Sequence, residues 1–358
     1  MTAEQSMLRD TIRSIFHSFS DLASPESFKK WPSPLWIELE KIGVTGIAIP
    51  ESAGGSGGSF VDAATAVFEV GRSAAAIPFA ETTMLCGWLI GLVGWEWTGS
   101  AETAAFVNGP AVECRRESHS LTLSGRVDVV PWARTASRIL LLVATGGGAY
   151  IVSLEPRDFS VVPSENLAGE PRDTVVIEGI TVNADRWAIS PISLDDFRIR
   201  GALIRSVAMA GAISSVADAT NAFALEREQF GRPIARFQAV QQLLARVTEE
   251  SVAAITSTRA AVDAVDTNGA AIAALAATVR ARKAATRVAR MAHQVHGAIG
   301  IAEEFPLHYW TSRLWSWRND FGSEAEWSER LATWVRNRGG ADELWPMLTD
   351  NFDVATKL

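Results

Sequence analysis

The chain has 358 residues, 47% of them hydrophobic and 21% charged, which is typical of a soluble globular protein of two or three domains. Its formal net charge of −8 argues against nucleic-acid binding, which requires a basic surface. Residues 1–13 lack the apolar core of a secretory signal. The two cysteines, Cys86 and Cys114, have neither metal-ligand spacing nor a disulfide framework, so we expect a cytoplasmic location and no bound metal.

Residues 1–100 are predicted to form a helical domain. Apolar side chains recur at helical spacing ahead of Gly43, and that glycine is expected to end the helix. A glycine-rich loop runs to Ser59, and helical periodicity returns from Phe60 to Gly71. The apolar stretch from Met84 to Val93 is too short to span a bilayer and predicts a buried helix.

Residues 101–193 change character and are predicted to form β-structure. Short β-branched runs are separated by Gly, Pro, Asn and Asp turns; the runs are LTLSGRVDVV, RILLLVA, AYIVSL, FSVVP and TVVIEGITV. This pattern favours a small antiparallel barrel or sandwich, and we expect a β-barrel.

Residues 194–358 are again helical. Three long Ala-rich stretches cover 204–225, 239–265 and 270–297, and short connections between long helices predict a four-helix bundle. The whole chain is therefore expected to be an α+β protein in the order helical domain, β-domain, helical bundle.

Two segments of the bundle have a helix end, a turn and a helix restart. They are EREQFGRPIARFQAVQQLLA, from Glu226 to Ala245, and HQVHGAIGIAEEFPLHYW, from His293 to Trp310. Such turns present backbone N–H groups and side chains, here Arg227, Gln238 and Gln294, which can donate to the phosphates and adenine of a nucleotide. Each segment taken alone is equally consistent with an ordinary helix connection.

Together, these segments and the glycine-rich loop resemble the motifs of the acyl-CoA dehydrogenase family. The residues Arg227, Phe230, Gly231, Phe237 and Gln238 match its R-x-x-F-G-x-x-x-x-x-F-Q motif, and Gln294, Gly297, Gly300 and Pro306 match its Q-x-x-G-G-x-G…P element. Ala298 replaces the second glycine of that element. The resemblance implies an FAD site formed by Arg227, Phe230, Phe237, Gln238, Gln294, Gly297 and Gly322. It also implies that this site is shared with a neighbouring subunit, in a homodimer or a dimer of dimers.

The position of the family's catalytic base carries an unexpected residue. In the family, a carboxylate removes the α-proton of an acyl-CoA while the flavin accepts the β-hydrogen as hydride. The usual glutamate, counted from Pro306, falls on Phe321, which cannot accept a proton, although Gly322 and Ser323 keep the rest of the pattern. Asp320 is our first candidate for the base and Glu324 the second. Further carboxylates follow the F-Q motif at Glu249, Glu250, Asp263 and Asp266, where a solvated role is the simpler interpretation.

The middle domain departs from the family as well. The acidic-proline element that ends in Gly-Ser-Asp in relatives has no counterpart between Gly99 and Leu121. The segment VPWARTAS, from Val130 to Ser137, does resemble the family strand that passes the flavin ring. The adenosine end of the implied site is thus well matched, and the flavin-ring end is not.

This combination resembles a divergent actinobacterial branch of steroid and lipid catabolism, whose members pair as unlike subunits in α2β2 assemblies. The resemblance implies an FAD-dependent dehydrogenase subunit that introduces a Cα–Cβ double bond into an acyl-CoA and passes electrons to an electron-transfer flavoprotein. The branch also implies a steroid-derived thioester as one expected substrate. The alternative is a non-catalytic subunit that completes the FAD site of its partner.

Overall fold

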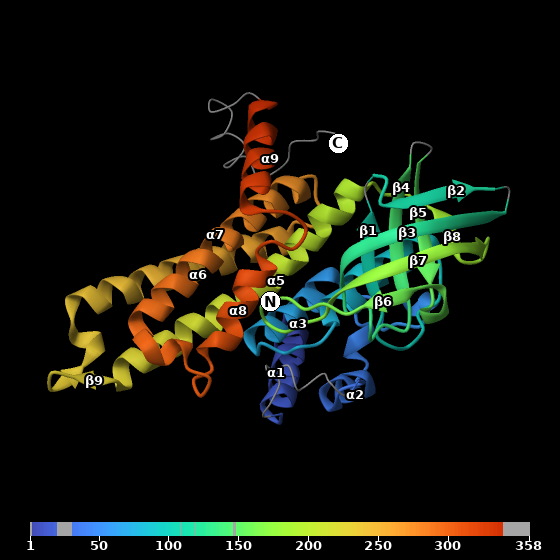
Figure 1. The fold of residues 1–358 in the computed structure, drawn as a ribbon. Helices are drawn as coiled ribbons and strands as arrows, with labels where there is room; N and C mark the ends of the chain where they lie inside the picture. Colours follow the sequence, from blue (N-terminus) through green and yellow to red (C-terminus); the bar gives the residue numbers. More distant parts are fainter. Residues whose placement is uncertain (1, 20–30, 108, 118, 146–147, 339–358) are drawn as a thin grey trace. The chain divides into compact units, whose positions relative to one another are not determined.

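A computed structural model describes residues 2–19, 31–107, 109–117, 119–145 and 148–338. The chain divides into two compact units, one made of residues 1–66 and 76–200, the other of residues 67–75 and 201–358 (Figure 1). The expected three-domain division, with boundaries near residues 100 and 193, stays a prediction.

The first unit begins with helices. They are α1 (Ala3–His17), α2 (Pro34–Lys41), most of α3 (Phe60–Arg72), a π-helical turn (Glu81–Cys86) and α4 (Gly87–Val93). Helix α2 starts where predicted because the Ser33 side chain accepts a hydrogen bond from the Trp36 N–H at 3.2 Å. Gly43 follows the end of α2 with a φ of 71°, which confirms the predicted stop. The stretch from Glu81 to Ile90 is almost entirely buried, as expected of its apolar sequence.

The strands of the first unit form two four-stranded sheets (Figure 1). One sheet has the order β1 (Thr103–Val107), β4 (Ile139–Thr145), β5 (Gly148–Leu154), β8 (Trp187–Ile189). The other has the order β2 (Val112–Arg116), β3 (Ser120–Pro131), β7 (Arg172–Asn183), β6 (Ser160–Val162). Pairing among the described strands does not close the sheets into a ring, so the predicted barrel is not confirmed. The strictly antiparallel expectation is wrong at one pair, since β1 runs parallel to β4.

One hydrophobic core holds the two sheets together. Leu121, Leu123 and Val127 of β3 share a single buried cluster with alternate residues of β4, β5 and β7. Because side chains alternate across a strand, this cluster requires the inner faces of the two sheets to face each other. The architecture corresponds to the sandwich form of the predicted β-domain.

The segment after β3 is anchored by a buried carboxylate. Asp173 of β7 is fully buried and accepts from the Arg134 backbone N–H at 2.9 Å and from the Arg134 guanidinium at 2.6 and 2.9 Å. These bonds raise the pKa of Arg134. Trp132, beside it, is 2% exposed and has a φ of 57°. The segment that resembles the flavin-passing strand therefore has a fixed conformation.

The second unit contains three long helices, α5 (Leu194–Glu226, from Gly201 onward), α6 (Gln238–Asp263) and α7 (Ala270–His296), followed by α8 (Leu307–Trp317) and α9 (Glu324–Arg336). Helix α6 packs along α7, and α8 and α9 both pack against α7. Between α5 and α6 lies a short hairpin of β9 (Glu228–Gln229) and β10 (Arg232–Pro233). The long helices confirm the predicted C-terminal helical domain.

The end of α3 and the helix α5 approach each other at two glycines. A Cβ on Gly71 would lie 1.9 Å from the Ala208 carbonyl oxygen, and one on Gly211 would lie 2.0 Å from the Phe68 carbonyl oxygen. No side chain fits at these distances, so both glycines are required by the backbone contact.

Helix α5 is long and apolar enough to cross a membrane by composition alone. However, 83% of its most apolar stretch is buried inside the protein. Such burial is characteristic of the core helix of a soluble protein.

Candidate functional site

The hairpin between α5 and α6 carries the first predicted motif. Phe230 and Gly231 form its two-residue turn with φ values of 53° and 76°, and the Phe230 side chain is 92% exposed. The Phe237 ring lies edge-on to Phe230 at 6.1 Å, and the Arg232 guanidinium lies 4.3 Å above Phe237. Arg227 is exposed at the base of the hairpin. The turn thus presents an aromatic and cationic surface to solvent.

The second predicted motif lies at the end of α7. Gln294 is exposed on the last turn, and Gly297 ends the helix with a φ of 64° and an open surface on its Cβ side. His296, which is 5% exposed, places Nδ1 2.8 Å from the Ala292 carbonyl oxygen. Since a carbonyl only accepts, Nδ1 carries the proton and Nε2 is an acceptor. Nε2 is buried and has no hydrogen-bond partner among the described residues.

A ring cluster joins the two motifs. Phe223, one turn before Arg227, stacks on His296 with ring centroids 4.3 Å apart, and Phe305 contacts both rings at 5.7 and 5.0 Å. The end of α5, the end of α7 and the hairpin therefore meet at one end of the helical unit. Six of the seven residues predicted to bind the cofactor lie at this end: Arg227, Phe230, Phe237, Gln238, Gln294 and Gly297.

The loop that carries the family's base position packs against a different part of α7, near Arg282. The Arg282 side chain is fully buried and donates to the Asp320 carbonyl oxygen at 2.7 Å and to the Gly322 carbonyl oxygen at 3.4 Å. Residues 282 and 296 are separated by about 21 Å along the helix axis, at 1.5 Å per residue. Arg282 thus holds Asp320 and Gly322 in one loop, and this loop lies apart from the hairpin motif.

Two buried arginines, Arg205 and Arg282, contact this loop. The Arg205 Nε atom lies 3.0 Å from Asp320 Oδ2, with side-chain exposures of 6% and 17%. Burial lowers the pKa of Arg282 to about 10, and the nearby Asp320 charge opposes that shift. Arg205 lies over the Trp317 ring at 5.4 Å, and Arg282 lies over the Trp327 ring at 5.9 Å. The carboxylate of the first candidate base is therefore engaged in a largely buried ion pair.

Phe321 and Glu324 occupy the rest of the loop. Phe321 has a φ of 63°, and its ring fills the space above Gly201, where an added Cβ would lie 2.5 Å from the ring. Glu324 is partly buried in the first turn of α9, where a negative charge stabilises the helix dipole. Glu250, one of the other carboxylates considered, is buried on α6 and pairs with Arg280 and Arg287.

Sequence reasoning missed Arg205 and Arg282, because arginines in Ala-rich helices are ordinarily solvated. The only available signal was their occurrence among apolar residues on the inner face. Among the described residues, no group of three or more His, Cys, Asp or Glu side chains is arranged to hold a metal ion.

Comparison with known proteins agrees with the fold and the motifs. Residues 2–98 match the N-terminal domain of acyl-CoA dehydrogenases, and residues 200–317 match their C-terminal domain. The acyl-CoA dehydrogenase FadE34 of Mycobacterium tuberculosis is 28% identical over 86% of this chain, which spans 44% of that relative's length.

Two solved structures show the same fold. A chain of the ChsE4-ChsE5 complex from Mycobacterium tuberculosis has a TM-score of 0.86 and 22% identity, covering 94% of this chain and 98% of that one. A variant of the Tcur3481-Tcur3483 steroid ACAD has a TM-score of 0.81 and 24% identity, with the same two coverages. The order of the helical and β segments, the two matched motifs and the family matches at both ends lead to one conclusion: the protein belongs to the acyl-CoA dehydrogenase family.

Proposed function

We propose that this chain is a subunit of an FAD-dependent acyl-CoA dehydrogenase in the cytoplasm. The assembly would introduce a Cα–Cβ double bond into an acyl-CoA thioester and pass the electrons to an electron-transfer flavoprotein. The observation that carries the proposal is the meeting of the hairpin motif and the α7 motif at one end of the helical unit.

The residues at this end suit the nucleotide half of FAD. Arg227 offers an exposed guanidinium, the side chain best able to make forked contacts to phosphate. Gln238 and Gln294 are exposed amides that can both donate and accept, and Gly297 leaves its backbone open. The Nε2 atom of His296, which is buried and has no partner in the described part of the chain, is a further polar atom at this end. When bound, the flavin would supply the hydride acceptor, while these residues hold and orient the nucleotide.

The exposure of Phe230 supports a site shared between subunits. The Phe230 ring is 92% exposed at the end of the hairpin, next to Phe237 and Arg232, and a neighbouring subunit that packs on this hairpin would cover it. The two similar solved structures are both named for pairs of differently named chains. We therefore propose an oligomer, either a homodimer-based assembly or a dimer of unlike dimers.

The substrate class rests on the same comparisons. One structural neighbour is named as a steroid ACAD, and relatives in the chain's own family come from mycobacteria. We propose a CoA thioester of a steroid-derived acid as the substrate of the assembly.

Asp320 is the candidate base within this chain, with Glu324 second. To act, the Asp320 carboxylate would have to exchange its Arg205 partner for the substrate's α-proton, at a hydrogen-bond distance of roughly 3 Å. That requirement favours a second candidate function, a non-catalytic subunit that completes its partner's FAD site. Phe321 at the usual base position and the Arg205–Asp320 ion pair are the specific observations behind it.

Flavin counting on the purified assembly tests the cofactor site. Arg227→Ala is expected to lower the FAD content per chain, whereas Arg259→Ala, an exposed arginine on α6, should leave it unchanged. Equal flavin content in both variants would refute the assignment of the nucleotide site to this hairpin.

Activity of Asp320→Asn in the same assembly separates the two functions. If this chain supplies the base, acyl-CoA dehydrogenation should fall by orders of magnitude while FAD stays bound. Full activity of Asp320→Asn would assign the base to Glu324 or to the partner. Full activity of Glu324→Gln as well would assign the base to the partner, and with it the non-catalytic role to this chain.

A further inference from the structure

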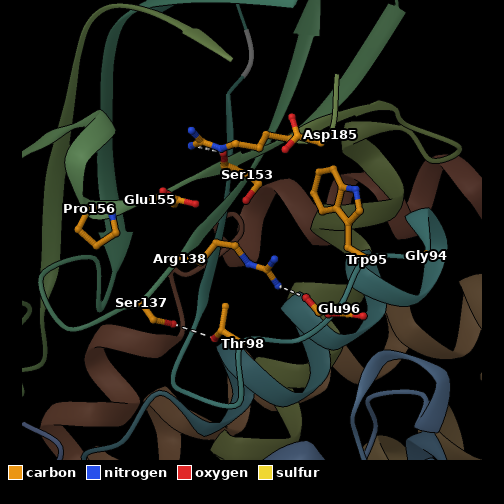
Figure 2. Close-up of a pocket in the computed structure, with 11 residues that line it drawn as sticks. Gly94, Trp95, Glu96, Thr98, Ser137, Arg138, Ser153, Glu155, Pro156 and Asp185 are labelled. Atoms are coloured by element: carbon orange, nitrogen blue, oxygen red, sulfur yellow. Dashed lines mark hydrogen bonds between the residues drawn. The ribbon is translucent and has the colours of Figure 1, made fainter. Parts of the chain in front are cut away.

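The first unit contains a cavity of about 520 Å³ that none of the predicted site residues lines (Figure 2). It lies among the loop after α4, the start of β4, the end of β5 and the turn before β8. Its volume falls within the range of small-molecule sites, roughly 300–1,000 Å³.

One wall is held by a buried ion pair. Arg138 pairs with Glu102 at 2.9 Å, with side-chain exposures of 12% and 0%. Arg138 also donates to the Glu96 carbonyl oxygen at 2.9 Å, and the Thr98 and Ser137 hydroxyls lie 3.0 Å apart. These contacts fix the loop after α4 against β4, so the wall is preorganised.

A second part of the lining, next to Arg138 on the same sheet, is held in the same way. Arg186 pairs with Asp158 and donates to the Ser153 carbonyl oxygen at 2.9 Å, while the Ser153 N–H donates to the Arg186 carbonyl oxygen at 2.8 Å. Both guanidiniums that line the cavity are therefore already neutralised by carboxylates.

The remaining charge of the lining is acidic. Besides the two paired arginines, three carboxylates line the cavity, those of Glu96, Glu155 and Asp185. Glu155 has an ion-pair partner in Arg157, whereas Glu96 and Asp185 lie exposed. An anionic ligand would meet like charges without compensation, so phosphates and carboxylates are disfavoured.

Hydrogen-bond donors are present alongside these acceptors. Ser153 is 6% exposed and lines the cavity, and its hydroxyl makes no hydrogen bond to the described residues. A ligand that satisfies these groups must donate to the carboxylates and can both donate to and accept from the Ser153 hydroxyl. Hydroxyl groups do both.

The positions of two ring-bearing side chains in the lining suit a ligand that contains a ring. In Figure 2 the Trp95 indole and the Pro156 ring lie on opposite sides of the cavity, with the polar side chains between them. An indole face suits the C–H face of a saturated ring, while hydroxyls at the ring edge reach the polar groups. We propose that this cavity binds a polyhydroxylated ring of monosaccharide size that is neutral or carries an amino group.

Three probes with one ring and different charges test this assignment. Glucose, glucosamine and glucuronate are titrated against the purified chain by ligand-observed NMR and calorimetry. We expect glucose and glucosamine to bind at millimolar concentration and glucuronate to bind roughly tenfold or more weakly, a difference of about 1.4 kcal/mol. Absence of binding by glucose and glucosamine, or equal binding of glucuronate, would overturn the proposal.

Variants locate the binding. Trp95→Ala and Ser153→Ala should each weaken glucosamine binding roughly tenfold, whereas Glu178→Gln, an exposed carboxylate on β7 outside the cavity, should not. Unchanged affinity in both cavity variants, or an equal loss in Glu178→Gln, would show that the sugar binds elsewhere and refute the site. The flavin content of the cavity variants should stay at the wild-type level, so this test is independent of the proposed dehydrogenase function.

Discussion

Asp320→Asn should destabilise the protein as well as test catalysis. The substitution removes the charge that faces Arg205, whose side chain is only 6% exposed. Removing one partner of a buried ion pair costs about 3–5 kcal/mol, because the other charge is left buried. The Asp320 side chain is 17% exposed, so water can partly solvate the Arg205 charge that the substitution leaves unpaired. We therefore expect the free energy of unfolding to fall by about 3 kcal/mol, the lower end of that range.

The matched control is Asp218→Asn. Asp218 pairs with Arg72 at 2.8 Å, but its side chain is 62% exposed. Exposed pairs contribute only about 0.2–1 kcal/mol, so this variant should unfold close to the wild type. The two pairs have similar geometry and differ in burial.

Urea unfolding of the purified proteins, followed by circular dichroism, measures both losses. A double-mutant cycle with Arg205→Met then isolates the coupling between Arg205 and Asp320. If Asp320→Asn loses no more stability than Asp218→Asn, the ion pair does not hold the loop, and the structural argument against Asp320 as a base fails with it.

Other predictions address the packing and the histidines. Gly211→Ala should lower the free energy of unfolding by about 3 kcal/mol or more, or prevent folding, because its Cβ would lie 2.0 Å from the Phe68 carbonyl oxygen. A melting temperature equal to that of the wild type would contradict the close approach of α3 and α5. Burial lowers the pKa of both His293 and His296 from the ordinary value of 6.5, so the unfolded chain takes up protons before the folded chain does. Stability should therefore fall as pH drops below about 6.5, and His296→Phe should reduce that fall. Parallel pH–stability curves for the wild type and His296→Phe would refute this contribution.

Local patterns in the sequence were sufficient for much of the fold. The stop at Gly43 follows from one residue's conformational freedom, and the long helices follow from Ala-rich periodicity. The strands β1 and β2 were missed because TAAFV lacks alternation and VECRR is mostly charged. The parallel pairing of β1 with β4 could not be predicted either. β2 and β3 lie between these two strands in sequence, so the pairing of β1 with β4 depends on long-range contacts.

The candidate site divides in the same way. Each of the two motifs, the hairpin and the end of α7, is a continuous stretch of sequence. Their residues could therefore be named from the sequence, although their proximity in space could not. The ion pair of Arg205 and Asp320 could not, because its partners come from α5 and the loop before α9. Burial of a charge depends on the whole packed unit, and no local pattern encodes it.

The hairpin turn has a consequence for engineering. Phe230 adopts a left-handed backbone conformation, which costs a bulky residue of order 1–3 kcal/mol, and within the described part of the chain it is 92% exposed. Asparagine or glycine would suit the same turn better. Sequence optimisation aimed at thermal stability alone would therefore replace Phe230 and would discard the ring that the turn presents. Stability and activity are expected to trade against each other at this position, so any library built to stabilise the chain should hold Phe230 constant.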